Sequence, residues 1–152
     1  MTRIRSEVMV RRAPEDVYDF LTTPANWVKW HPSTIKVTGD AAHPLDVGET
    51  CTEEFVVAGR HGVTDWIVTR RERPSIWVIE SRNSSGGSAT ISYQVAPADG
   101  GTRFTRTLEY AMPNALLTLL DALVIRRRVE RESQTAVTNL RDLLERAYSV
   151  AV

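Results

Sequence analysis

Residues 12–33 read RAPEDVYDFLTTPANWVKWHPS, and the prolines in this stretch predict how the chain begins to fold. A helix should begin at Pro14, because proline suits the first turn and the acidic residues after it complement the helix dipole. It should end near Thr22, because Pro24 disfavours helical geometry in the residue before it. The residues between Pro24 and Pro32 are therefore expected to form a second, short helical turn.

Seven β-strands are predicted around these two helices. The first covers residues 3–12, where apolar and polar residues alternate as in a half-buried strand. Six further segments are rich in Val, Ile, Thr and aromatic residues. These segments are 34–38, 50–58, 63–73, 75–82, 89–96 and 102–110. They follow one another at hairpin spacing, with glycine-containing turns at 58–62 and 97–101, so the sheet should be antiparallel.

A long helix is predicted from about Asn114 to Ala147, and its apolar face also carries Arg126 and Ser133. Polar groups on an inward face need partners. Either they line a wet cavity, or the helix bends near Arg126 and lets this side chain reach solvent. Residues 116–125 (LLTLLDALVI) are apolar nearly all round. This predicts either a break in the helix or a cover over its second face, from a lid contact or a partner.

Four stretches of the chain match one known superfamily in their order and in the elements that carry them. They are RAPEDVYDFLTTPANWVKWHPS (12–33), TRRERPSIWVIES (69–81), YQVAPADGGTRFTRTLEY (93–110) and TNLRDLLE (138–145). The chain thus resembles the START-like or SRPBCC superfamily, and within it the polyketide cyclase/dehydrase and lipid-transport branch. The resemblance implies a single α+β domain over residues 1–152 with the helix-grip fold. In that fold a curved antiparallel β-sheet of about seven strands wraps around a long C-terminal α-helix, with two short helices between strands 1 and 2.

The resemblance also implies a cavity between sheet and long helix, which members use for hydrophobic or amphipathic small molecules. Strand alternation places Arg106 on the same inner face as Phe104 and Leu108. Arg106 would then need an anion, either a carboxylate of the protein or a group of a ligand. The residues expected to line the cavity are Trp30, His31, Phe55, Trp66, Trp77, Tyr93, Phe104, Arg106, Leu108, Tyr110, Leu119 and Arg126.

The sequence contains no motif for a metal, a cofactor or a nucleophile. His31, His43 and His61 lie in three separate loop-like stretches without HxxxH, HExxH or CxxC spacing, so no metal site is expected. No carboxylate lies at a spacing that would orient His31, which favours packing or capping over catalysis. Cys51 is the single cysteine, and a small buried thiol is favoured over a nucleophile. The chain lacks GxSxG, P-loop and GxGxxG motifs, so no cofactor is expected.

The charge balance argues against a nucleic-acid partner. The chain has 19 Lys and Arg residues and 19 Asp and Glu residues, so it lacks a strong global field. Within RRRVERE (126–132), Arg126 can pair with Glu130 and Arg128 with Glu132. The apolar runs do not match a signal peptide or a membrane span. Together with the single cysteine, this predicts a cytoplasmic protein.

Three functions are compatible with these features. The first is binding of a lipid, polyketide or aromatic molecule in the cavity. The second is a cyclase or dehydratase enzyme, in which Tyr93, Arg106 or His31 would orient a polyketide-like substrate and assist proton transfer or loss of water. The third is a protein-interaction module, in which residues 116–125 contact a partner or a second copy in a homodimer.

Overall fold

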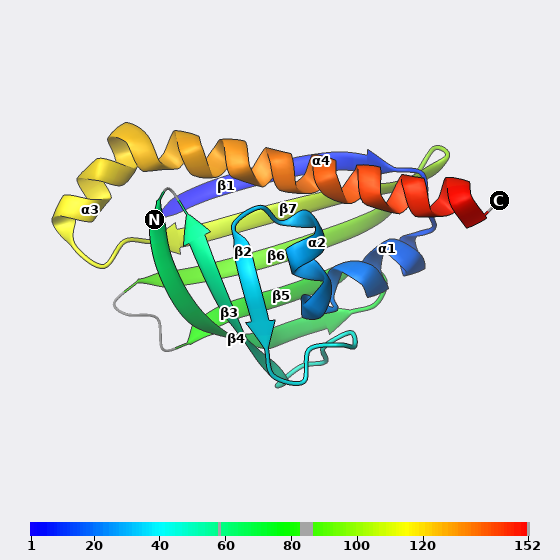
Figure 1. Cartoon of the computed structure of the whole chain (residues 1–152), viewed down its shortest axis with the longest axis horizontal. Coiled ribbons are helices and arrows are strands. Elements are labelled where there is room, and N and C mark those ends of the chain that lie inside the picture. The colour runs from blue at the N-terminus through cyan, green and yellow to red at the C-terminus, as the bar shows by residue number, and fades with distance from the viewer. Residues whose placement is uncertain (58, 83–86, 152) are drawn as a thin grey trace.

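The computed structural model describes residues 1–57, 59–82 and 87–151. Its elements follow the predicted order (Figure 1). They are β1 (Thr2–Val10), α1 (Pro14–Leu21), η1 (Pro24–Asn26), α2 (Trp27–Trp30), β2 (Thr34–Thr38), β3 (Thr50–Val57), β4 (Arg60–Glu72), β5 (Ile76–Arg82), β6 (Ser88–Ala98), β7 (Gly101–Ala111), α3 (Ala115–Leu120), η2 (Asp121–Ile125) and α4 (Arg126–Ala151). The turn predicted at 58–62 lies in part outside the described residues.

The seven strands form one antiparallel sheet in the order β1-β7-β6-β5-β4-β3-β2. From β2 to β7, strands adjacent in the chain are adjacent in the sheet. The first strand then pairs with the last, from Thr2 opposite Tyr110 to Val10 opposite Thr102. The helix α4 runs along the curved sheet, with α1 near one end and α3 at the other (Figure 1). The predicted α+β helix-grip fold is confirmed.

The prolines shape the segment between β1 and β2 as the sequence predicts. Pro14 occupies the first turn of α1, which ends at Leu21, and Pro24 begins the next helical turn, η1. The indole of Trp27 then donates a hydrogen bond from Nε1 to the carbonyl oxygen of Leu21 at 3.2 Å. This bond fixes the short helix α2 against the end of α1.

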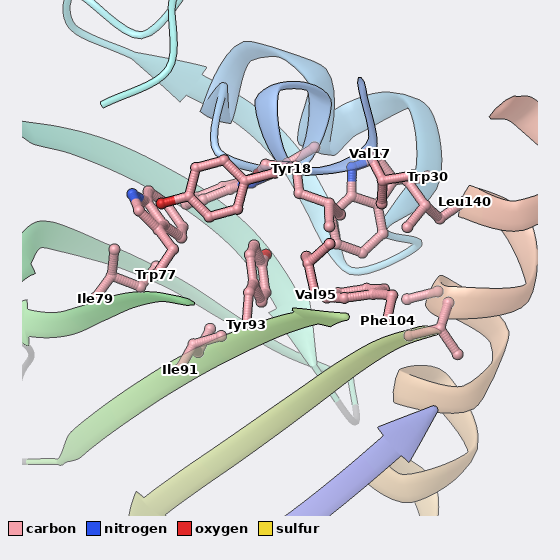
Figure 2. Packing of buried hydrophobic residues seen from close by; sticks show 14 of the residues in the cluster. Val17, Tyr18, Trp30, Trp77, Ile79, Ile91, Tyr93, Val95, Phe104 and Leu140 are labelled. Atoms are coloured by element: carbon pink, nitrogen blue, oxygen red, sulfur yellow. The ribbon is translucent and has the colours of Figure 1, made fainter. Parts of the chain in front are cut away.

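An aromatic cluster fills the part of the concave face that α1 and α2 cover (Figure 2). The ring of Tyr93 lies between Trp77 and Phe104, with 5.3 Å between ring centroids on each side. Trp30 contacts Phe104 edge-on at 6.5 Å. Leu140 of α4 is buried in the same cluster. The core therefore joins the sheet, the short helices and the long helix.

The segment before α4 changes its helix type and does not break. The chain passes from α3 through η2, a π-helical turn, into α4. In this turn Asp121 is buried and accepts hydrogen bonds from the hydroxyls of Thr2, at 2.5 Å, and Tyr110. Five large apolar side chains of the segment are 41–67% exposed, namely Leu116, Leu119, Leu120, Leu123 and Val124. No described residue covers this apolar face.

The turn between β6 and β7 depends on two glycines for different reasons. Gly100 has a φ of 76°, in the left-handed region that favours glycine. At Gly101 a Cβ atom would overlap the carbonyl oxygen of Val10. The hairpin predicted at 97–101 therefore also packs its turn against the end of β1.

The aromatic cluster should dominate the stability of the fold. Phe104 is fully buried, so Phe104→Ala should lower the free energy of unfolding by about 3–5 kcal/mol. Urea denaturation measures this change. Val28→Ala on α2, where the side chain is 47% exposed, is the control and should change it by less than about 0.5 kcal/mol. Similar losses for the two variants would contradict this assignment of the core.

Candidate functional site

A cavity of about 300 Å³ lies between the sheet and α4, beside the aromatic cluster. Strands β3, β4, β6 and β7 supply most of its wall, and Ile125 and Val129 contribute from the helical side. Its walls are predominantly apolar. The large apolar side chains that line it include Phe55, Val63, Trp66, Ile91, Leu108, Ile125 and Val129. Cavities of this kind accept small molecules and orient them through a few polar groups.

Six of the polar side chains at the wall of this cavity come from six separate parts of the chain. They are His31 after α2, Glu53 on β3, Thr64 on β4, Tyr93 on β6, Arg106 on β7 and Ser133 on α4. Strand alternation accounts for four of them, because every second residue of a strand faces the concave side. The polar groups thus come from distant parts of the sequence and meet only in the fold.

Arg106 is the buried cation of the site, with 4% of its surface exposed. Its Nη1 donates a hydrogen bond to Ser133 Oγ at 3.2 Å, and the guanidinium also interacts with the hydroxyl of Tyr93. Its Nε has no hydrogen-bond partner. Within the described ranges no carboxylate oxygen lies within 4.0 Å of the guanidinium nitrogens. The internal salt bridge that the sequence left open is therefore not formed.

Glu53 is the buried carboxyl of the site. Its Oε1 accepts a hydrogen bond from Thr34 Oγ1 at 2.6 Å, and its Oε2 accepts one from Trp66 Nε1 at 2.8 Å. Burial raises the pKa of Glu53, although these two hydrogen bonds and the positive charge of Arg106 oppose the rise. At a given pH, the carboxyl of Glu53 is therefore protonated more often than a carboxyl in water.

His31 presents a neutral imidazole to the cavity. Its Nδ1 accepts a hydrogen bond from the backbone N–H of Ser33 at 3.3 Å, so the neutral ring carries its proton on Nε2. Burial, together with the charge of Arg106, holds the pKa of His31 well below its usual value. The Nε2 atom is itself buried and has no partner. His31 thus offers an unused N–H donor.

Unpartnered polar atoms are concentrated at this cavity. In the described part of the chain, five buried side-chain polar atoms lack a hydrogen-bond partner. Three of them belong to the cavity wall: His31 Nε2, Thr64 Oγ1 and Arg106 Nε. Buried polar groups are normally hydrogen-bonded, so each exception requires an explanation. A bound molecule would supply the missing partners.

Seven of the twelve residues expected at the cavity line it. They are His31, Phe55, Trp66, Tyr93, Arg106, Leu108 and Tyr110. Ligand binding by these residues stays a prediction. Three others, Trp30, Trp77 and Phe104, belong to the aromatic cluster beside the cavity and do not line it (Figure 2). Their rings pack against each other and against Tyr93, which itself lines the cavity and so connects it to the cluster.

The structure places the remaining two expected residues, Leu119 and Arg126, away from the cavity. Leu119 is exposed on α3, and Arg126 reaches solvent and pairs with Glu130 at 3.1 Å. Leu119 lies before the π-helical turn at 121–125, which takes more residues per turn than an α-helix and so changes the phase of the segment before it. Arg126 lies after this turn, and its exposure is one of the two alternatives that the sequence left open for it. Ser133, which lies after this turn, does face inward.

Glu53, Thr64 and Ser133 were not among the twelve residues expected to line the cavity, although Glu53 was one of the strand residues with a polar side chain that a cavity could use. A signal existed for Glu53, because it lies two residues before Phe55 and shares its face of the strand. Thr64 has no such signal, since a threonine in a strand is ordinary. Ser133 was recognised as inward-facing, but only the fold shows that it meets Arg106.

The described residues contain neither a candidate metal site nor a candidate membrane-spanning helix. No group of three or more His, Cys, Asp and Glu side chains is arranged to hold a metal ion among them. Likewise, none of the described helices is both long and apolar enough to cross a membrane.

Comparison with known proteins identifies relatives of the whole chain. A family model described as polyketide cyclase/dehydrase and lipid transport matches residues 1–145. A Thermus thermophilus protein superposes with a TM-score of 0.81 at 14% identity, covering 96% of this chain and 99% of that one. A Chromobacterium violaceum protein superposes with a TM-score of 0.71 at 20% identity, covering 95% of this chain and 99% of that one. The Aha1 dimer from Colwellia psychrerythraea superposes with a TM-score of 0.64 at 20% identity, covering 95% of this chain and 97% of that one. At these identities the structures show a shared fold alone, and no curated protein matches the chain significantly.

The buried carboxyl should make stability depend on pH in a defined direction. A carboxyl whose pKa is raised by folding contributes stability that is fully present below its unfolded pKa, near 4.5, and is lost as the pH rises through the folded value. The advantage of the wild type over Glu53→Gln in free energy of unfolding should therefore shrink from pH 4 towards pH 8, about the range in which most proteins are stable. Urea denaturation of both proteins measures this difference. The contribution of His31 to it cancels, because both proteins contain His31. An advantage that grows with pH would contradict the assignment.

Proposed function

Because the chain belongs to the polyketide cyclase/dehydrase and lipid-transport family, we propose that it binds a hydrophobic or amphipathic small molecule in the cavity under α4. The observation that carries the proposal is the predominantly apolar wall of a cavity of about 300 Å³. This volume is at the lower end of the range for ligand pockets. A compact aromatic, polyketide or medium-chain lipid molecule fits it better than a lipid with two long chains.

The polar groups of the cavity support an amphipathic ligand over a purely hydrophobic one. Arg106 and Thr64 are buried and each has an unpartnered polar atom on the wall. A hydrocarbon would leave these atoms without partners, which costs about 1–3 kcal/mol for each buried polar group. A ligand with an oxygen-bearing end would satisfy them.

A cyclase or dehydratase reaction is the second candidate for the same cavity. It is supported by Glu53, a buried carboxyl with a raised pKa, and by the neutral imidazole of His31, because both residues line the cavity. Groups with perturbed pKa values in one cavity are candidates for proton transfer. The mass of the molecule recovered from the protein separates binding from dehydration, and its chromatographic retention separates binding from a cyclisation that conserves mass. A binding protein returns an added molecule unchanged, whereas a dehydratase returns it lighter by one water.

Filling the cavity should abolish binding. Ala89 faces the cavity from β6, so Ala89→Phe should weaken binding of the neutral apolar fluorophore N-phenylnaphthylamine by about tenfold or more. Thr90→Phe is the matched control, because the next residue on the same strand faces the opposite side of the sheet and should leave binding unchanged. Fluorescence titration measures affinity, and native mass spectrometry of the purified wild type detects a retained molecule. Equal affinity of both variants, or no binding by the wild type, would contradict the proposal.

The exposed apolar side chains of α3 and η2 support self-association as an additional property. Leu116, Leu119, Leu120, Leu123 and Val124 form a surface that no described residue covers. The Aha1 structure from Colwellia psychrerythraea is a dimer of the same fold. We infer that a second copy of this chain covers the surface. The cytoplasmic location stays a prediction that rests on the single cysteine, Cys51.

A charge on this surface should separate the two copies. Leu123→Asp should convert a dimer into a monomer in size-exclusion chromatography with light scattering, because a carboxylate cannot enter an apolar interface without a partner. Val28→Asp places the same charge on an exposed apolar position of α2 and should leave the dimer intact. A wild type that is already monomeric would remove the self-association proposal.

A further inference from the structure

We propose that the polar part of the cavity wall is a carboxylate site, and that the ligand is a monocarboxylic acid with an apolar body whose carboxylate faces Arg106. This inference rests on the proposed binding function and names the chemical class of the molecule bound. It is carried by three observations: a buried cation without a counter-ion, two further unused donors beside it, and apolar walls around them.

The guanidinium of Arg106 remains charged at every pH at which the protein would be studied. Burying an ion without a counter-ion is unfavourable by several kcal/mol. The partners that the fold gives Arg106, Ser133 and Tyr93, are neutral hydroxyl groups. Its Nε–H is buried and has no acceptor. The fold thus retains a positive charge on the cavity wall and leaves one of its donors free.

The two carboxyl groups on the cavity wall do not provide the missing anion. Both oxygens of Glu53 accept hydrogen bonds from other residues, and burial raises the pKa of Glu53, which weakens it as a counter-charge. Glu132 accepts a hydrogen bond from Ser33 Oγ at 3.0 Å and pairs with Arg128 at 3.8 Å. Among the residues that the structure describes, neither forms an ion pair with Arg106. An anion from outside the chain would complete the site.

The donors around the cavity suit a carboxylate better than other oxygen-bearing groups. His31 Nε2–H and the Thr64 hydroxyl are unpartnered, as is Arg106 Nε–H, and all three residues line the same cavity. A carboxylate is an acceptor with two oxygens and about four lone-pair positions, so it can receive several such donors. A ketone or amide would accept hydrogen bonds but would leave the cation unbalanced. A phosphate dianion would bring a second negative charge that no further buried cation in the described cavity wall would balance.

Matched acids and amides test this proposal, because each pair differs in charge and hardly in shape. Decanoate is compared with decanamide, and phenylbutyrate with phenylbutyramide, in competition with N-phenylnaphthylamine at neutral pH. At least one acid should displace the fluorophore about 10- to 100-fold better than its amide, as expected for a charge-assisted hydrogen bond. Arg106→Gln should remove this preference, because it weakens binding of the acid much more than binding of the amide.

Arg103→Gln is the matched control. Arg103 lies on the same strand, β7, but is exposed and pairs with Glu7 at 3.8 Å on the other side of the sheet. Its loss removes the same charge from the molecule and should leave the preference for the acid intact. If Arg106→Gln does not fold, the comparison of acid with amide in the wild type still decides the question, and Arg106→Met provides a second neutral variant.

The outcomes separate this proposal from the proposed function. Acids and amides that compete equally, or an acid preference that survives Arg106→Gln, would overturn the carboxylate site, while binding of the fluorophore would still support a ligand-binding protein. Failure of every acid to compete would likewise overturn the carboxylate site. Failure of the fluorophore itself to bind would count against the proposed function.

Discussion

The packing of Tyr93 between Trp77 and Phe104 divides the concave face of the sheet into a filled part and a hollow part. On one side the aromatic rings pack between the sheet and the helices α1 and α2 (Figure 2). On the other side the sheet and α4 are separated by the cavity. Tyr93 belongs to both parts, because its ring is stacked in the cluster and its side chain also lines the cavity. The cluster thus supplies the rigidity that a precise binding site needs.

The division also explains how the protein can keep a buried charge. The aromatic core packs beside the cavity, and the ionisable side chains Arg106 and Glu53 are not among its members. Arg106 and Glu53 can therefore remain in the other half although buried ionisable groups seldom add net stability. The residues that stabilise the fold and the residues of the candidate binding site thus lie on neighbouring parts of the same concave sheet face.

The sequence predicted the fold well because the signals for it are local. Pro14, Pro24 and Pro32 determine the beginning of the chain, and strand alternation identifies each strand without knowledge of the others. Alternation also placed Arg106 and Tyr93 correctly on the inner face. It could not show that Arg106 lacks an ion-pair partner, because this depends on where Glu53 and Glu132 direct their oxygens.

Both Leu119 and Arg126 were expected at the cavity, but the change in helix type at 121–125 accounts for Leu119 alone, because Arg126 lies after this turn. A projection at constant spacing assigns every residue upstream of such a turn to the wrong face. The same feature has an evolutionary consequence. Deletion of one residue from this turn would restore α-helical spacing and rotate α3 by about 100° around its axis. An insertion or deletion there would thus change which leucines of α3 face solvent, although no side chain is replaced. Descendants of this chain could therefore acquire a different apolar surface while keeping the same sheet and cavity.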